Sequence, residues 1–406
     1  MLFFFHPLSL FFCVCNTYNE KFSKIFIILF CGYLGYSFHV SPLSDLDANR
    51  YIEKFDEYCQ GGNQIEIISF FDNLWKDPDH LEITFKLLSY LASFISSDYH
   101  VLFALMGLLY GVFLTLNLSQ FKNYSDFRFL GKNFVIILLL ILPPWLINGF
   151  DFWMATQIFI AGFFALLKNK YIKSFFFFAF ASVTHWSFLI FIIGYLLLVR
   201  IRSERVLIVL FFSSFIIKYF IGTEIIENIL SNLQLVNIAL KAQVYLDGEV
   251  ALPGGNIYGL ILSCHRLISV LIFLYIFIKF KSDVNSNLRR LLNATIVIIT
   301  ISNLISVVPI LGRFISISVY LILFNFAVFF VHNLDLDFRL ERRRMLKTLI
   351  VNFTLFIILL DFVYNGFLVI GVLSILGNPL ISYFVRSFDF VLGNVYGHIL
   401  NMLNSI

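Results

Sequence analysis

Long apolar stretches separated by short polar segments run through most of this chain. Residues 206–221, 260–280 and 314–331 form stretches of about 16 to 24 residues, close to the length of a helix that crosses a hydrocarbon core of roughly 30 Å. A helix satisfies its own backbone hydrogen bonds, as a lipid environment requires. The pattern therefore predicts an all-α fold, a polytopic integral membrane bundle of about 10 to 12 transmembrane helices, some of them short or re-entrant.

The polar segments differ in charge, and this difference predicts the topology. Acidic residues gather in segments 41–98 and 222–256, whereas the remaining polar segments are rich in lysine and arginine. Because basic loops stay on the cytoplasmic side, we expect both acidic segments to be extracytoplasmic parts of one membrane domain that comprises residues 1–406. The predicted cytoplasmic clusters begin at Lys21, Lys122, Lys168, Arg200, Lys279 and Arg339.

Segment 41–98 has helical spacing, which distinguishes it from a simple linker. Tyr51, Phe55 and Tyr58 recur at intervals of three or four residues, and a second apolar series follows at 67–75, after the glycine pair Gly61 and Gly62. This pattern predicts amphipathic helices on the membrane surface with a break between them. Residues 83–95 then predict an interfacial helix that leads into a span over 99–118.

Segment 174–199 is flanked by basic clusters at both ends, which conflicts with a single membrane crossing. It is too long for one ordinary span and too short for two full ones. Two short helices resolve the conflict and place Thr184, His185 and Trp186 at a polar turn between them, which is tolerated where it lines protein or a wet cavity. One long tilted helix is the alternative.

The composition narrows the classes of function. Hydrophobic residues make up 60% of the 406 residues and charged residues 13%, so a soluble fold is excluded. The net charge of +4 gives no support to nucleic-acid binding. The sequence has no nucleotide-binding glycine loop, no HExxH or GxSxG motif and no carboxylate pair with the spacing of a metal site. We therefore expect neither a metal nor a cofactor.

Two candidate groups are ionisable residues in or near the predicted spans, where such residues are costly. Asp47, Arg50 and Tyr51 are three and four positions apart and share one helical face. A helix cap with a local ion pair would explain them structurally. His185 suits proton transfer or contact with a diphosphate, because imidazole side chains titrate near neutral pH. A buried, hydrogen-bonded structural histidine is the alternative.

Three further groups are candidates. Arg313, in the sequence PILGRF, is predicted at the outer end of a span, where its guanidinium suits phosphate oxygens; an arginine that snorkels to lipid headgroups is the alternative. His265 and Arg266 lie near the outer end of another span and are expected to face the bundle interior. They would either contact a ligand or form polar contacts that hold neighbouring helices together. Asp151 and Gln157 stand at the outer start of a third span.

Five motifs follow one another in order along the chain: SDLDANRYIEKF (44–55), LEITFKLLSYLASFI (81–95), FDFWMATQIFIAGFFALLKNK (150–170), SVTHWSFLIFI (182–192) and GRFI (312–315). This ordered set resembles the EpsG and Wzy-type family of polysaccharide (O-antigen) polymerases, well over the first half of the chain and loosely over the second. One departure is Asp151, which stands where the family often has an arginine.

The resemblance implies a membrane glycosyltransferase of O-antigen or exopolysaccharide biosynthesis that needs no nucleotide sugar and no cofactor. A glycan on undecaprenyl diphosphate would be the donor, and a sugar hydroxyl of a lipid-linked repeat unit would be the acceptor. The implied catalytic residues are Asp47, His185 and Arg313, and the implied substrate-binding residues are Arg50, Tyr51, His265, Arg266 and Gln157.

The resemblance also implies partners and a location. The partners are undecaprenyl-diphosphate-linked oligosaccharides, the lipid bilayer and, as an option, a chain-length regulator. The location is a bacterial inner (cytoplasmic) membrane, crossed several times, with the active site facing the periplasm or exterior. A flippase for lipid-linked sugars, an O-antigen ligase and a membrane acyltransferase are the alternatives at this point, although matching broken helices in two repeated halves, expected of many transporters, are not visible.

Overall fold

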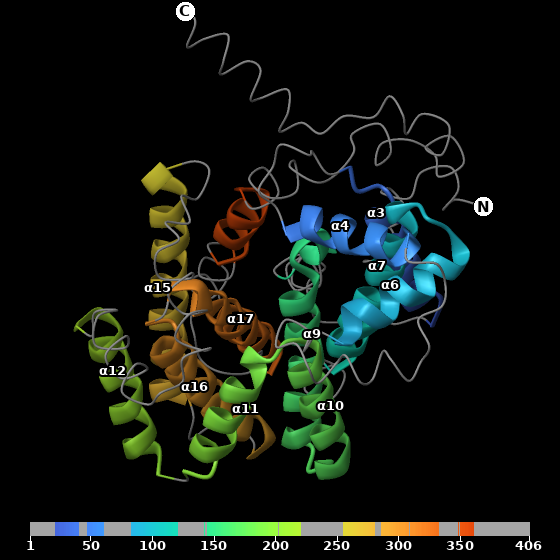
Figure 1. The fold of residues 1–406 in the computed structure, drawn as a ribbon. Coiled ribbons are helices and arrows are strands. Elements are labelled where there is room, and N and C mark those ends of the chain that lie inside the picture. Colours follow the sequence, from blue (N-terminus) through green and yellow to red (C-terminus); the bar gives the residue numbers. More distant parts are fainter. Residues whose placement is uncertain are drawn as a thin grey trace, which may run out of the picture. The chain divides into compact units, whose positions relative to one another are not determined.

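The fold was analysed in a computed structural model (Figure 1). The structure describes residues 21–39, 47–60, 83–120, 142, 144–201, 203–220, 255–280, 286–307, 309–332, 348 and 350–360. Within these ranges the chain forms helices, and no β-strand is assigned. The all-α fold predicted from the hydrophobic pattern is confirmed.

Four described helices are long and apolar enough to cross a membrane, and this confirms the polytopic architecture. Shorter apolar helices of 10–17 residues accompany them, as expected for a bundle with short or re-entrant elements. The total of 10 to 12 spans stays a prediction. The four candidate spans are Tyr99–Leu118, Pro144–Leu167, Ile261–Ile278 and Ser286–Ile305.

The chain divides into two compact units, Met1–Phe188 with Thr354–Ile406, and Leu189–Phe353. The first unit contains α3 (Lys21–Tyr36), α4 (Asp47–Gln60), α6 (Ile83–Ile95), α7 (Tyr99–Leu118), the 3-10 helix η3 (Pro144–Gly149), α9 (Phe150–Leu167) and α10 (Tyr171–Thr184). The second contains most of α11 (Ser187–Leu198), with α12 (Glu204–Phe220), α15 (Gly255–Phe280), α16 (Ser286–Ile305), the 3-10 helix η4 (Pro309–Phe314) and α17 (Ile315–His332).

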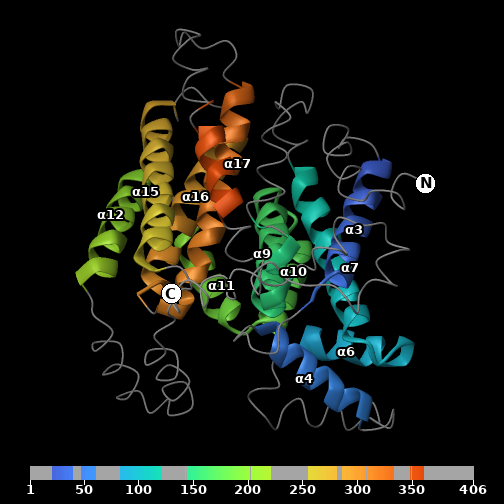
Figure 2. The ribbon, with the colours of Figure 1, turned by 90° about the horizontal axis from the view of Figure 1, so that it is seen from above.

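Glycines bring α3 and α7 into backbone contact. A Cβ atom at Gly35 would lie 2.0 Å from the carbonyl oxygen of Phe103, and a Cβ atom at Gly107 would lie 2.2 Å from that of Cys31. Only glycine fits at such positions, and small residues are the usual means by which membrane helices approach closely. Figures 1 and 2 show α3 and α7 side by side.

Helix α9 is buried along almost its whole length. Asn117 on α7 donates from Nδ2 to the backbone oxygen and to Oε1 of Gln157, at 2.8 Å and 2.7 Å. Nε2 of Gln157 in turn donates to the hydroxyl of Tyr110 at 3.1 Å. On the opposite side of α9, the hydroxyl of Ser174 on α10 donates to the carbonyl of Gly162 at 2.9 Å.

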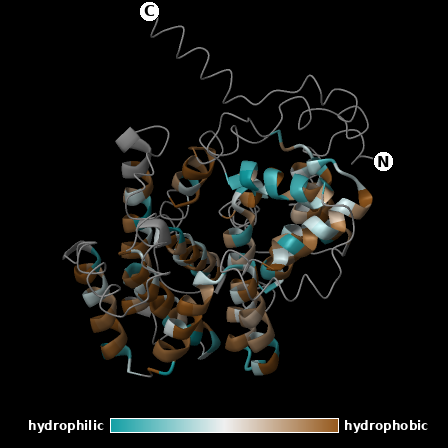
Figure 3. Ribbon diagram, viewed as in Figure 1, coloured by the Kyte–Doolittle hydropathy of each residue, from teal (hydrophilic) through white to brown (hydrophobic). Residues whose placement is uncertain are grey.

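The amphipathic helix predicted around Tyr51 and Phe55 is present as α4. Ala48, Tyr51 and Phe55 are buried, whereas the positions between them are mostly charged and open to solvent. The hydropathy colouring shows α4 largely in teal (Figure 3). The predicted helices over 83–95 and 99–118 are confirmed as α6 and α7. The second amphipathic series at 67–75 lies outside the described residues.

The predicted break near His185 is confirmed. Helix α10 ends at Thr184 and α11 begins at Ser187, so one long tilted helix over 174–199 is wrong. His185 itself has extended backbone angles, φ −150° and ψ 113°, and its N–H donates to the carbonyl of Ala181 at 2.9 Å. The chain therefore changes direction at this residue while closing the last turn of α10.

In the second unit α16 packs against α12 and α17. Nδ2 of Asn325 on α17 donates to the hydroxyl of Thr295 on α16 at 2.8 Å, and Nδ2 of Asn303 on α16 donates to the hydroxyl of Ser214 on α12 at 3.2 Å. Such buried polar contacts between apolar helices hold their register in lipid. Segment 222–256 lies outside the described residues except for its last two, which begin α15.

Candidate functional site

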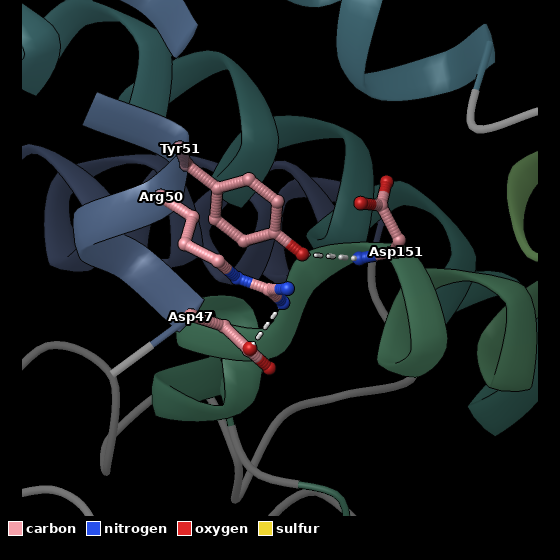
Figure 4. A network of polar contacts seen from close by, with 4 residues as sticks. All are labelled: Asp47, Arg50, Tyr51 and Asp151. Carbon is pink, nitrogen blue, oxygen red and sulfur yellow. Dashed lines mark hydrogen bonds and ion pairs between the residues drawn. The ribbon is translucent and has the colours of Figure 1, made fainter. Parts of the chain in front are cut away.

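Helix α4 packs on α6 and η3 and reaches the start of α9 through Tyr51. Tyr51 projects from α4, and its hydroxyl oxygen accepts a hydrogen bond from the backbone N–H of Asp151 at 3.3 Å (Figure 4). The tyrosine ring packs on Phe85 of α6, with ring centroids 4.8 Å apart. Tyr51 is only 6% exposed. One side chain therefore joins the amphipathic helix α4 to the first turn of α9 and to α6.

Asp47, one turn before Tyr51 on the same helix, forms an ion pair with Arg50, the residue next to Tyr51 (Figure 4). The Arg50 side chain is 67% exposed and that of Asp47 is 26% exposed, so the pair opens to solvent. The Asp47 carboxylate also faces the start of α9, because a Cβ atom at Gly149 would lie 3.5 Å from its Oδ2. The local ion pair predicted as the structural alternative is present, and it lies beside a helix start where anionic groups are favoured.

Asp151 adds a second carboxylate to this cluster. It occupies the first turn of α9 and is 2% exposed. The unpaired N–H groups at the start of a helix carry partial positive charge and stabilise a carboxylate there. The start of α9 therefore carries a buried carboxylate, Asp151, beside the half-buried Asp47 and the exposed Arg50.

His185 lies against the same turn of α9. Its ring meets that of Phe152, the residue after Asp151, edge to face with centroids 5.5 Å apart. Its Nδ1 is hydrogen-bonded to the Ser187 hydroxyl at 2.8 Å. The hydroxyls of Thr184 and Thr84 are 2.7 Å apart, which ties the break between α10 and α11 to α6. His185 is half-buried and is therefore held in place without being sealed inside the protein.

The second unit holds the remaining cationic candidates. Arg313 is exposed at the end of η4, just before α17. It is followed by the fully buried Phe314, whose ring stacks on that of Phe191 with centroids 4.5 Å apart. His265 is 1% exposed and its ring meets Phe353 at 5.1 Å, whereas Arg266 is half-buried. The inward orientation predicted for this pair therefore holds for His265 and in part for Arg266.

A family model supplies the decisive comparison. The model of the EpsG family matches residues 25–369. The chain belongs to the EpsG family. No curated protein matches the sequence, and no solved structure matches it either. The match covers every candidate site residue and extends the resemblance, first recognised mainly in the first half of the chain, well into the second half.

The EpsG-family chain brings together five residues in its first unit: Asp47, Arg50, Tyr51, Asp151 and His185. Asp151 was only a minor candidate in the sequence, although a charged residue just inside a span is a signal for function. Convergence of this group with Arg313, His265 and Arg266 of the second unit stays a prediction.

Gln157 belongs to packing in this structure. It is fully buried about 9 Å further along α9 than Asp151, and both ends of its amide are engaged by α7. These hydrogen bonds satisfy a buried amide in an apolar bundle, and a contact between Gln157 and substrate stays a prediction.

Proposed function

We propose that this EpsG-family membrane protein is a polysaccharide repeat-unit polymerase. It would transfer a growing glycan from undecaprenyl diphosphate to a lipid-linked repeat unit, in O-antigen or exopolysaccharide biosynthesis, at the outer face of a bacterial inner membrane. The observation that carries the proposal is the gathering of Asp47, Arg50, Asp151 and His185 around the first turn of α9, in a chain matched by the family over 25–369.

The reaction requires two kinds of side chain. The acceptor hydroxyl attacks the anomeric carbon of the donor glycan, a new C–O bond forms, and the bond from that carbon to the diphosphate oxygen breaks. The hydroxyl proton passes to a basic side chain, and the leaving diphosphate needs cationic or N–H donors. Asp47 and His185 are the proposed proton acceptors, and Arg50 is the proposed diphosphate contact in the first unit. We assign Arg313, His265 and Arg266 of the second unit to the diphosphate as well.

Asp151 and Tyr51 have supporting roles in this scheme. Asp151 would orient hydroxyl or amide groups of a sugar, because carboxylate oxygens accept strong hydrogen bonds. Tyr51 presents a ring with one polar edge, a side chain suited to sugar rings, and it keeps α4 on α9.

The test is a deletion strain complemented with the intact gene and analysed for surface glycan and lipid-linked intermediates. A polymerase deficiency leaves single lipid-linked repeats and removes the ladder of long chains. Full-length polymers that stay on the lipid carrier would identify a ligase, and repeats confined to the inner leaflet would identify a flippase. A normal ladder that lacks only acyl groups would identify an acyltransferase. Each of these last three results contradicts the proposal.

A further inference from the structure

The turn between α9 and α10 borders a shallow, open hollow at the other end of α9 from Asp151. The hollow has a volume of about 610 Å³ and is lined by residues 169–173 together with Phe176 and Phe177. The turn is tight: Asn169 has a positive φ of 58°, and the N–H of Lys170 donates to the carbonyl of Ala165 at 2.9 Å. A left-handed residue of this kind is a standard way to end a helix, and it fixes the direction in which α10 departs.

Three lysines surround this hollow. Lys170 and Lys173 line it, and Lys168 stands beside it with Nζ hydrogen-bonded to Gln120 Oε1 at 2.5 Å. Burial lowers the pKa of Lys168 from its ordinary value, and the positive charges of Lys170 and Lys173 lower it further. The three ammonium groups are therefore close enough to repel one another, so a bound anion would relieve that repulsion.

No described carboxylate of the first unit offsets this charge. The described acidic residues of that unit lie on α4, at Asp98 and at Asp151. Asp98 caps the start of α7 and Asp151 lies in the first turn of α9, whereas Gln120 and Lys168 meet beyond the opposite ends of the same two helices. The lysines thus form a one-sign patch at one end of the unit.

Apolar side chains adjoin the lysines on the outside of α10. Tyr171, Ile172 and Phe176 are 63%, 77% and 66% exposed. The Tyr171 hydroxyl donates to Oδ1 of Asn169 at 3.2 Å, which holds the ring across the turn, and Nζ of Lys173 lies 5.5 Å from the centre of the Phe177 ring. Ammonium groups next to exposed aromatic and aliphatic surface match a molecule that has a phosphate at one end and hydrocarbon at the other.

We propose that the α9–α10 turn binds the headgroup phosphate of an anionic phospholipid, with Lys170 and Lys173 on the phosphate and Tyr171, Ile172 and Phe176 along the first part of the acyl chains. The positive-inside rule places this end of the helices at the cytoplasmic leaflet. This site is separate from the proposed reaction at the start of α9. Inorganic phosphate would contact the lysines but leave the exposed apolar side chains uncovered. A phospholipid can contact both, so the lipid is the occupant that the whole site fits.

The test uses the full chain, purified in detergent and titrated with phosphatidylglycerol, phosphatidylcholine or inorganic phosphate while its unfolding temperature and retained lipid are measured. We expect phosphatidylglycerol to raise the unfolding temperature and to be retained in preference to phosphatidylcholine. The double variant Lys170→Gln with Lys173→Gln should bind it about 30-fold more weakly, as expected for the loss of two lysines near an anionic surface. The charge-conserving double variant Lys170→Arg with Lys173→Arg should retain binding, and so should Lys54→Gln on α4.

Several outcomes overturn the proposal. Equal retention of the two phospholipids by the unmodified chain does so, as does undiminished retention by the double glutamine variant. Inorganic phosphate that stabilises the chain equally and displaces phosphatidylglycerol would assign the site to a free anion. Should the double variant not fold, Ile172→Ser, which keeps all three charges and alters a 77% exposed side chain, must still lower retention. None of these measurements depends on glycan polymerisation.

Discussion

The hydroxyl oxygen of Tyr51 lies 3.3 Å from the backbone nitrogen of Asp151, 100 residues later in the chain. Together with the packing of α4 on α6 and η3, this contact holds the polar face of α4 next to the first turn of α9. The Asp47–Arg50 pair precedes Tyr51 on α4, and His185 packs beside Asp151 through Phe152. The geometry of the proposed site in the first unit therefore depends on α4 staying docked.

Tyr51→Phe should weaken that docking without emptying the space beside Phe85. The substitution keeps the ring and removes one hydrogen bond, which we expect to cost about 1 kcal/mol of stability. Surface glycan should shift to shorter chains, visible as a compressed ladder on a gel, with little change in protein level. Tyr51→Ala should reduce chain length and stability together. An unchanged ladder in both variants would remove Tyr51 from the site.

Arg50→Ala should abolish long chains while leaving the fold intact, because the Arg50 side chain is 67% exposed. Loss of one cationic contact to a departing diphosphate is expected to slow the reaction roughly 100-fold. The measurement is glycan transfer in vesicles supplied with lipid-linked repeats. Lys54→Ala is the matched control, since Lys54 is an exposed cation one turn further along α4. Similar loss in both variants would point to bulk charge instead of a specific contact.

His185→Ala should leave single lipid-linked repeats and no polymer if His185 accepts the hydroxyl proton, with a loss of about 100-fold or more. Ser187→Ala keeps the imidazole and removes its partner at Nδ1, so we expect a smaller loss and a shifted pH profile of transfer. Asp47→Asn tests the alternative that Asp47, and not His185, accepts the proton. The variant with the larger loss, and with the acidic limb missing from its pH profile, identifies the proton acceptor, because a general base acts only when it is deprotonated.

Gly35→Ala should destabilise the protein by about 1–3 kcal/mol, since its new methyl group would lie 2.0 Å from the Phe103 carbonyl oxygen and the two helices would have to separate. Thermal unfolding in detergent measures the effect. Gly194→Ala is the control: its Cβ would lie 3.4 Å from the nearest side-chain atom, an ordinary contact, and alanine favours a helix more than glycine does. We expect Gly194→Ala to be neutral or stabilising.

Local sequence patterns predicted the helices and one break well. The spacing of Tyr51 and Phe55 is sufficient for an amphipathic helix, and the charges that flank 174–199 are sufficient for a break near His185. Both signals are local. The spacing of apolar residues on one helix, and basic clusters at both ends of one apolar segment, can be recognised without knowing which other helices pack against them. The same holds for α6 and α7, whose ends fall where the pattern placed them.

Tertiary partners were harder to predict. The family resemblance implied that Gln157 binds substrate, and only the structure shows that Asn117 and Tyr110 on α7 are hydrogen-bonded to its side-chain amide. Asp151 drew less attention than Asp47, since nothing in the sequence indicates that the two carboxylates meet the same helix start. Such pairings depend on helix packing between segments far apart in the chain, about which residue types alone say little.

The hydrogen bonds between α7 and Gln157 also limit how the protein can move. If α9 slid by one residue, the buried amide of Gln157 would lose its hydrogen bonds to Asn117 and Tyr110. These contacts therefore fix α7 and α9 relative to each other. Among the described residues, helix α4 has no such pair of buried amide contacts to α9 and is joined to its first turn by the 3.3 Å contact of Tyr51, so we expect α4 to fluctuate more than α7 does relative to α9. Spin labels on α4 and α9 should therefore show a broader distribution of distances than labels on α7 and α9.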